Sequence, residues 1–114
     1  MFYNAKKFNE PVNFDTSKVT DMYGMFQGAE EFNQPINFDT VNVGNMQDMF
    51  HKAKKFNETI SFTDTSKVTD MNNMFAYAEA FNQPVNFNTP KSYQYEQYVC
   101  KHQSLQPRPL WFWF

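Results

Sequence analysis

The residue types that most often carry catalysis are scarce in this 114-residue chain. Its two histidines are His51 and His102, and its single cysteine is Cys100. Cys100 and His102 lie two residues apart, but no third group is evident that would orient them as a nucleophile and its base. His51 lies beside Lys52 on the expected polar side of a helix, where a surface role is the simpler interpretation. We therefore expect no catalytic residue and no enzyme activity.

Carboxylates recur with a regularity that could serve a metal. Asp15, Asp39 and Asp64 are spaced by 24 and 25 residues, as in a calcium ladder. The glycine-rich nonapeptide of such ladders is absent, and Asn88 stands in the fourth copy. The chain has neither a P-loop nor a glycine-rich dinucleotide turn, and one cysteine excludes a thiolate zinc cluster. We expect no cofactor and no metal.

These side chains are positioned by a repeat. Met1, Met25, Met49 and Met74 are separated by 24, 24 and 25 residues, and Phe follows each of them. The extra residue of the last interval lies near Thr63. A period of this length is typical of a solenoid. We assign residues 1–91 to a solenoid of about four repeats that start at these methionines.

Each repeat combines two hydrophobic periods. Met22, Met25, Phe26 and Ala29 recur at i, i+3, i+4 and i+7, which predicts one face of a short helix. Residues 35–38 alternate apolar and polar side chains, as a half-buried strand does. The sequence therefore predicts an α/β repeat solenoid in which each coil is a short parallel strand plus a short helix. The expected core of the best-preserved copy is Met22, Met25, Phe26, Ala29, Phe32, Ile36, Phe38 and Val43.

Two polar columns recur at fixed places in the repeat. Asparagine follows Phe in every copy, and we interpret these residues as a structural ladder whose amides bond the backbone of the next coil. A second column lies on the polar strand positions, and we predict it as a binding row. The ladder is Asn9, Asn33, Asn57 and Asn82, and the row is Asn13, Asn37, Ser61 and Asn86.

Charged pairs alternate in sign between copies. Lys6-Lys7, Glu30-Glu31 and Lys54-Lys55 occupy the same place in successive repeats. In a stack each basic pair would face an acidic pair, which favours one register because a slip by a whole coil would oppose like charges.

The phrases MFQGAEEFNQPINFDT and TSKVTDMNNMFAYAEAFNQPVNF closely resemble the repeat of BspA-like leucine-rich-repeat surface proteins of bacteria. The resemblance covers residues 1 to about 91. It implies a leucine-rich-repeat-like solenoid on a cell surface, often in lipoproteins, with adhesion or host-interaction roles and no known catalysis. The implied partner is a protein or glycan on a host or neighbouring cell.

Residues 92–114 do not continue the repeat. Back-translating Lys91–Leu110 with permitted codons and deleting one A gives KVTNMSNMFANTKAFNQDL, which is the next repeat in phase. We interpret this tail as a frameshifted C-terminus. The alternative to a surface interaction module is accordingly a truncated gene fragment without its own function. A genuine C-terminal cap over the last coil is the rival interpretation of the tail.

Net charge and the distribution of apolar residues narrow the range of expected partners further. The formal net charge of -2 and the absence of a basic stripe give no electrostatic case for nucleic acid. No apolar run approaches the ~20 residues of a membrane span, and MFYNAKKF lacks the pattern of a signal peptide. Uncapped solenoid ends predict self-association.

Overall fold

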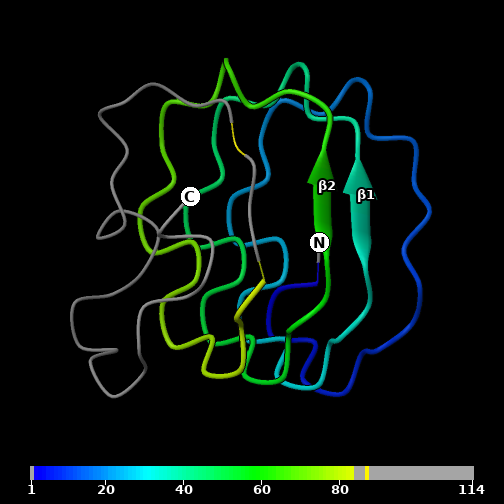
Figure 1. The fold of residues 1–114 in the computed structure, drawn as a ribbon, viewed down its shortest axis with the longest axis vertical. Helices are drawn as coiled ribbons and strands as arrows, with labels where there is room; N and C mark the ends of the chain where they lie inside the picture. The colour runs from blue at the N-terminus through cyan, green and yellow to red at the C-terminus, as the bar shows by residue number, and fades with distance from the viewer. Residues whose placement is uncertain (1, 84–86, 88–114) are drawn as a thin grey trace.

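The protein forms a stack of coils, each about one sequence repeat long. The computed structural model describes residues 2–83 and 87. Figure 1 shows successive coils following one another across the molecule, with β1 (Ile36–Phe38) and β2 (Ile60–Phe62) side by side. The two strands are parallel, with Ile36 opposite Ile60 and Phe38 opposite Phe62. The described part of the chain is therefore a solenoid with one two-stranded parallel sheet.

A second line of backbone contacts joins the coils away from the sheet. Asp21 pairs with Asn45, and Asn45 pairs with Asp70, each as an isolated parallel bridge. The Met22 N–H donates to the Asn45 carbonyl at 2.8 Å, and the Met46 N–H donates to the Asp70 carbonyl at 2.8 Å. The same hydrogen bond therefore recurs from coil to coil, as it must when each coil repeats the geometry of the previous one.

Stacked phenylalanine rings fill the space between the coil walls. Phe26 and Phe32 of one coil lie 4.3 Å apart between ring centroids, and Phe26 lies 5.3 Å from Phe50 in the next coil. Phe50 repeats this relation with Phe56 at 4.4 Å and with Phe75 at 5.6 Å. The core predicted for the second copy is buried throughout, with exposed fractions of 8% or less at Met22, Met25, Phe26, Ala29, Phe32, Ile36, Phe38 and Val43.

The predicted helix in each coil is wrong. Residues 2–83 and 87 contain no helix, and the segments 23–28, 47–52 and 72–77 are runs of turns. Met25 and Ala29 donate their N–H groups to carbonyls three residues earlier, at 3.3 and 3.1 Å, whereas the Phe26 N–H donates to Met49 in the next coil at 2.8 Å. A helix would keep all of these donors within its own segment. In this structure the N–H donors bond alternately to carbonyls of the local turn and to carbonyls of the neighbouring coil.

Left-handed backbone explains why the helix does not form. Gly24 and Gly28 have φ of 57° and 73°, and the equivalent residues of the next coil, Asp48 and Lys52, have φ of 56° and 63°. A right-handed helix cannot pass through such residues. Positive φ at the third position is what a type II turn requires. Each coil therefore makes two tight turns in place of two helical turns.

Short polar side chains at the start of these segments stabilise the turns. Asp21, Asn45 and Asp70 each accept, through Oδ1, the N–H of the residue two positions on, at 2.9, 3.0 and 3.0 Å. This short-range bond is the Asx turn. A capping residue and an Asx-turn residue are of the same types, so the sequence could not distinguish the two.

The expectation of a strand in every coil is also wrong. Among the described residues only Ile36–Phe38 and Ile60–Phe62 are strands. The Thr63 N–H extends the β1–β2 ladder by donating to the Phe38 carbonyl at 3.3 Å. One coil earlier, the equivalent Asp39 N–H donates to the side-chain Oγ1 of Thr16 at 2.9 Å. A side chain thus takes the place of the ladder bond beside the first coil.

Candidate functional site

The predicted binding row forms an exposed column on the sheet. Asn37 lies opposite Ser61 in the strand register, and both side chains are exposed, as is that of Asn13 in the preceding coil. The fourth predicted member, Asn86, lies outside the described residues. The three described members are small polar residues that hardly change between coils, so this row presents much the same surface in every repeat.

The asparagines that follow Phe bond the backbone of the next coil. Asn9 Oδ1 accepts the Asn33 N–H at 2.8 Å, Asn33 Oδ1 accepts the Asn57 N–H at 2.9 Å, and Asn57 Oδ1 accepts the Asn82 N–H at 2.8 Å. Each side-chain oxygen therefore satisfies a backbone donor that its coil-to-coil neighbour would otherwise leave unpaired.

A threonine ladder, which sequence reasoning missed, holds the opposite end of the strands. Thr16 and Thr40 are buried, and their hydroxyls donate to the carbonyls of Asp39 and Asp64 at 3.0 and 2.7 Å. Thr63, the extra residue of its repeat, donates through Oγ1 to Asp39 Oδ1 at 3.0 Å. The recurrence of Asp-Thr in three of the repeats was the available signal.

The carboxylates of the recurring aspartates accept hydrogen bonds from residues two positions further along the chain. Asp15 Oδ1 accepts the Ser17 hydroxyl and N–H at 2.7 and 3.0 Å, and these bonds lower the pKa of the Asp15 carboxyl. Asp39 and Asp64 accept the N–H groups of Val41 and Ser66 in the same way. Among the described residues no group of three or more His, Cys, Asp or Glu side chains is placed to hold a metal ion.

The tight turns carry a different kind of surface, which we name the turn face. In one of its columns Tyr3, Gln27, His51 and Ala76 follow one another from coil to coil. The neighbouring columns are equally varied, and three exposed tyrosines lie among them: Tyr3, Tyr23 and Tyr77. The turn face comprises Tyr3, Tyr23, Gln27, Asp48, His51 and Tyr77.

Asp48, His51 and Gln27 form a polar cluster at the centre of the turn face. The Gln27 Nε2 lies 3.2 Å from His51 Nδ1, which accepts this hydrogen bond in the neutral tautomer that carries its proton on Nε2. Asp48 Oδ1 lies 3.9 Å from the same Nδ1. The His51 ring also packs on Tyr77, with centroids 5.8 Å apart. His51 is thus part of a cluster drawn from three coils, and the simple surface role that the sequence indicated for it is incomplete.

Burial shifts both ionisable groups of this cluster toward their neutral forms. Desolvation raises the pKa of Asp48, an effect that His51 and the Tyr23 side chain oppose and Asp70 reinforces. Desolvation likewise lowers the pKa of His51; Lys52 adds to this, and Asp48 opposes it. Both effects share one cause, because the turn face holds these charges out of water.

The cluster also contains two unfilled acceptors. Gln27 Oε1 and Asp48 Oδ1 are buried and have no hydrogen-bond partner among the described residues. Asp48 as a whole is only 8% exposed. Buried acceptors without a donor are unusual and costly. The turn face therefore holds two buried oxygens that can still accept hydrogen bonds.

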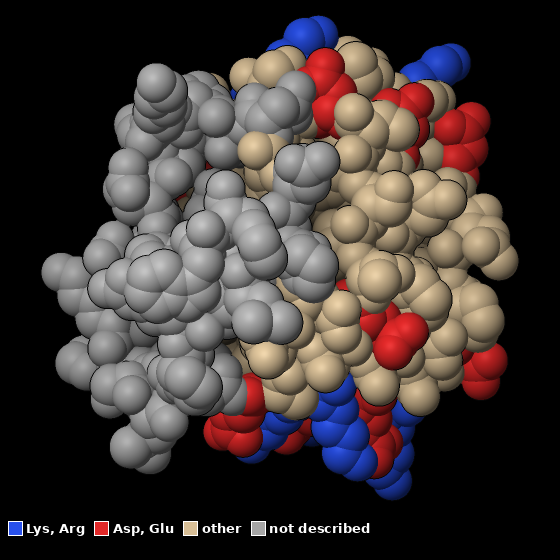
Figure 2. All heavy atoms as spheres, viewed as in Figure 1, with Lys and Arg blue, Asp and Glu red and all other residues tan. Residues whose placement is uncertain are grey.

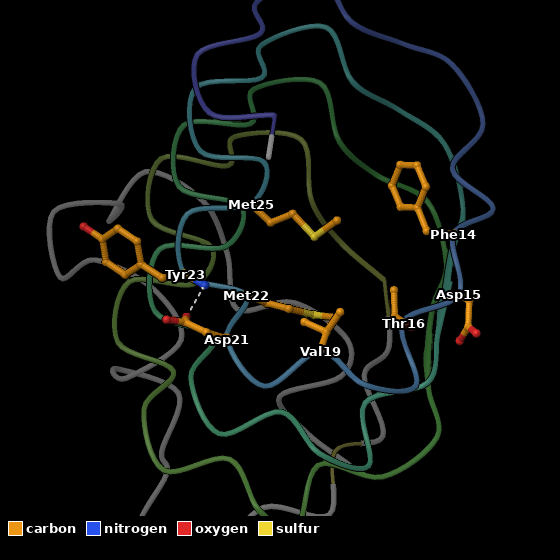
Figure 3. Close-up of a pocket in the computed structure, with 8 residues that line it drawn as sticks. All are labelled: Phe14, Asp15, Thr16, Val19, Asp21, Met22, Tyr23 and Met25. Carbon is orange, nitrogen blue, oxygen red and sulfur yellow. Dashed lines mark hydrogen bonds between the residues drawn. The ribbon is translucent and has the colours of Figure 1, made fainter.

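A cavity of about 340 Å³ lies against the first coils. Figure 3 shows its lining, in which Met22 and Met25 point inward while Tyr23 points away toward the turn face. Val19 and the half-exposed Phe14 complete its apolar wall. This cavity is mainly apolar, so it is suited to packing and not to acid–base chemistry.

Charged pairs line the edge where the coils turn back toward the strands. Glu30 pairs with Lys54 at 3.4 Å, and Glu31 pairs with Lys55 at 3.8 Å. Figure 2 shows acidic and basic side chains interleaved along the lower edge of the molecule. These partners come from adjacent coils, so the alternation of sign along the sequence becomes attraction across the stack.

Comparison with known proteins identifies a family for the chain. No curated protein and no solved structure matches the chain at a significant level. No helix long and apolar enough to cross a membrane occurs in the described part of the chain. A family profile matches residues 1–111, which is nearly the whole sequence. The chain therefore belongs to the family described as Mycoplasma protein of unknown function, DUF285.

Proposed function

We propose that this chain is a non-catalytic interaction module of a bacterial cell surface, and that the turn face contacts a partner protein. The resemblance of its repeat to BspA-like surface proteins supports the surface location and an adhesive role. A stack of coils presents an extended surface, on which a large partner can be held by many weak contacts.

The observation that carries this choice is the contrast between two faces of the same stack. Side chains change from coil to coil on the turn face, whereas Asn13, Asn37 and Ser61 are nearly constant along the sheet. A varied surface can be specific for one partner, whereas a uniform one offers the same contact in every coil. The turn face also exposes Tyr3 and Tyr23, and tyrosine is enriched at protein interfaces.

The proposal predicts which variant loses binding. An array of extracellular proteins and glycans is screened with the full chain, and any hit is measured again with two matched triple variants. We expect Tyr3→Ser, Tyr23→Ser and Tyr77→Asn together to abolish binding. We expect Asn13→Ser, Asn37→Ser and Ser61→Asn together to preserve it. The reverse result would transfer the function to the sheet row, and an array without any hit would contradict an adhesive role.

A further inference from the structure

The two unfilled acceptors of the turn face lie in a stack whose asparagine and threonine ladders are paired from coil to coil. The asparagine and threonine ladders supply a donor for each acceptor from coil to coil. Gln27 Oε1 and Asp48 Oδ1 have none among the described residues. The Asp48 side chain is 12% exposed, but its Oδ1 is buried and does not face bulk water. A ligand that supplied N–H or O–H donors here would remove a penalty that the free protein carries.

Backbone geometry explains part of the choice of residue at position 48, but not its charge. Asp48 has φ of 56°, and Asn73, its equivalent in the next coil, has φ of 57°. Asparagine and aspartate both tolerate this left-handed conformation, so the fold alone would accept either residue. Aspartate adds a negative charge in a poorly hydrated place, which needs a reason beyond the turn.

The surroundings of Asp48 are suited to a flat cation. The Tyr23 side chain lowers the pKa of the Asp48 carboxyl, which places it near this group, and its ring is half exposed, as is that of Tyr3. Tyr3 also lies close to Gly24, since a Cβ placed on Gly24 would be 3.7 Å from Tyr3 Cδ2 and 2.9 Å from Gln27 Oε1. The rings of Tyr3 and Tyr23 therefore lie near the two acceptor oxygens that have no donor among the described residues.

We propose that the turn face binds the guanidinium group of an arginine side chain on a partner protein, with Asp48 Oδ1 and Gln27 Oε1 as its acceptors. This assignment rests on the proposed function and specifies its chemistry. A guanidinium has five N–H donors and no acceptor, so two of its N–H groups can fill both oxygens at once while the other three face solvent or the partner protein. It also stacks on tyrosine rings.

Access to Asp48 requires only a side-chain movement. The Tyr23 N–H is held by Asp21 Oδ1 at 2.9 Å, so the main chain stays in place while the half-exposed ring turns outward. The carboxylate then faces the incoming guanidinium, and the ring can cover it from the side. His51 keeps the Gln27 amide oriented through the 3.2 Å contact between Nε2 and Nδ1, which leaves Oε1 free to accept.

The test uses a minimal ligand and its neutral analogue. The full, isotope-labelled chain is titrated at pH 7.5 with N-acetyl-arginine amide, and the His51 and Tyr23 ring signals are followed by NMR. N-acetyl-citrulline amide has nearly the same shape without the charge, and N-acetyl-lysine amide has the charge without the planar fork. We expect saturable shifts of these signals with the arginine compound and at least tenfold weaker binding of the lysine compound. The citrulline compound should cause no shift. Equal responses to arginine and citrulline, or none at all, would overturn the assignment.

Single substitutions measure the contribution of each acceptor to binding separately. Asp48→Asn should weaken binding of the arginine compound at least tenfold, and Asn73 shows that asparagine suits this backbone. Gln27→Glu should strengthen it severalfold by adding charge, which a merely disrupted fold would not do. Asp39→Asn changes a carboxylate outside the turn face and should change nothing. Unaltered binding by Asp48→Asn would refute the site. If arginine fails while the tyrosine variants still abolish partner binding, only this assignment falls and the proposed function stands.

Discussion

The side-chain Oδ1 of Asn33 accepts the backbone N–H of Asn57 at 2.9 Å, one coil further along the stack. Asn33 itself donates its N–H to Asn9 Oδ1 at 2.8 Å. Asn33 therefore bonds both neighbouring coils, the preceding one through its backbone N–H and the following one through its side chain. Only the oxygen of the amide takes part in these bonds, which makes the ladder open to a simple test.

Asn33→Ala should lower the free energy of unfolding by about 1 kcal/mol, because it removes one hydrogen bond and leaves the Asn57 N–H without its acceptor. Asn33→Asp keeps an acceptor of the same shape and should cost less than the alanine variant. Urea unfolding of both variants, followed by far-UV circular dichroism, measures the difference. Equal losses in the two variants would mean that the Oδ1 contact is not what stabilises this column.

The ion pairs between adjacent coils predict that thermal stability depends on the sign of the charges at positions 30 and 31. Replacing Glu30 and Glu31 by lysine removes the pairs with Lys54 and Lys55 and puts like charges in their place. All four side chains are at least one-third exposed, so each lost pair is worth about 0.2–1 kcal/mol. At roughly 4–8 °C per kcal/mol for a small domain, the melting temperature should fall by several degrees in low salt. Restoring opposite charge with Lys54→Glu and Lys55→Glu should recover part of the loss, because Lys6 and Lys7 of the preceding coil would still face lysines. A melting curve unaffected by either change would contradict pairing between coils.

Stability should fall as the pH is lowered past the ordinary pKa of histidine, about 6.5. Burial lowers the pKa of His51 in the folded chain, so the unfolded chain binds more protons just below this pH. Protonation then favours unfolding, and the loss is complete once the pH is below the folded-state pKa. Asp48 acts in the opposite direction and at lower pH, because its raised pKa makes the folded chain bind the extra proton.

His51→Gln isolates this contribution, since Gln27 occupies the same place one coil earlier. Urea midpoints of the variant should change less between pH 7.5 and 5.5 than those of the parent chain. An identical pH profile in the two proteins would show that His51 titrates alike in the folded and unfolded states.

The sequence predicted which side chains face the core but not the path of the backbone. Met22, Met25, Phe26 and Ala29 are buried, and their spacing fits one face of a helix. The same spacing also fits a chain that makes two tight turns, with Gly24 and Gly28 in the left-handed region. Lys52 was the misleading residue, because lysine favours helices and rarely adopts the positive φ that it has here. Stacking against two neighbouring coils imposes this conformation, and a periodicity read within one coil cannot reveal it.

The candidate site was missed for a related reason. His51 was weighed against its sequence neighbours, whereas its partners Gln27 and Tyr77 come from the coils on either side. The repeat alignment already placed Gln27 and His51 in one column. Comparison of columns for variability, in place of a search for recurring polar residues, would have brought the turn face to attention beside the sheet row.

The apolar cavity beside Val19 predicts association of two molecules through this surface. Met22 and Met25 line the cavity from within, and the apolar contact area would grow if a second molecule packed against it. Light scattering during size-exclusion chromatography should give an apparent mass that rises with concentration for the parent chain. Val19→Asp should hold the mass at that of a monomer, whereas Asn37→Asp on the sheet should not. A constant monomer mass for the parent chain would exclude this association.

Lys52 provides the sharpest test of the turns themselves. With φ of 63°, a lysine here bears the steric cost of roughly 1–2 kcal/mol that side chains meet in the left-handed region. Lys52→Gly removes that cost and matches Gly28 one coil earlier, although the unfolded chain gains entropy that offsets part of the benefit. We expect a net increase of about 0.5–1 kcal/mol in the free energy of unfolding. In a helix the same substitution would lower it by about 1 kcal/mol. Lys52→Ala, the control, should leave stability nearly unchanged in a turn, because alanine keeps the Cβ, and should raise it in a helix. The sign of the glycine effect in urea unfolding therefore decides between the two backbones.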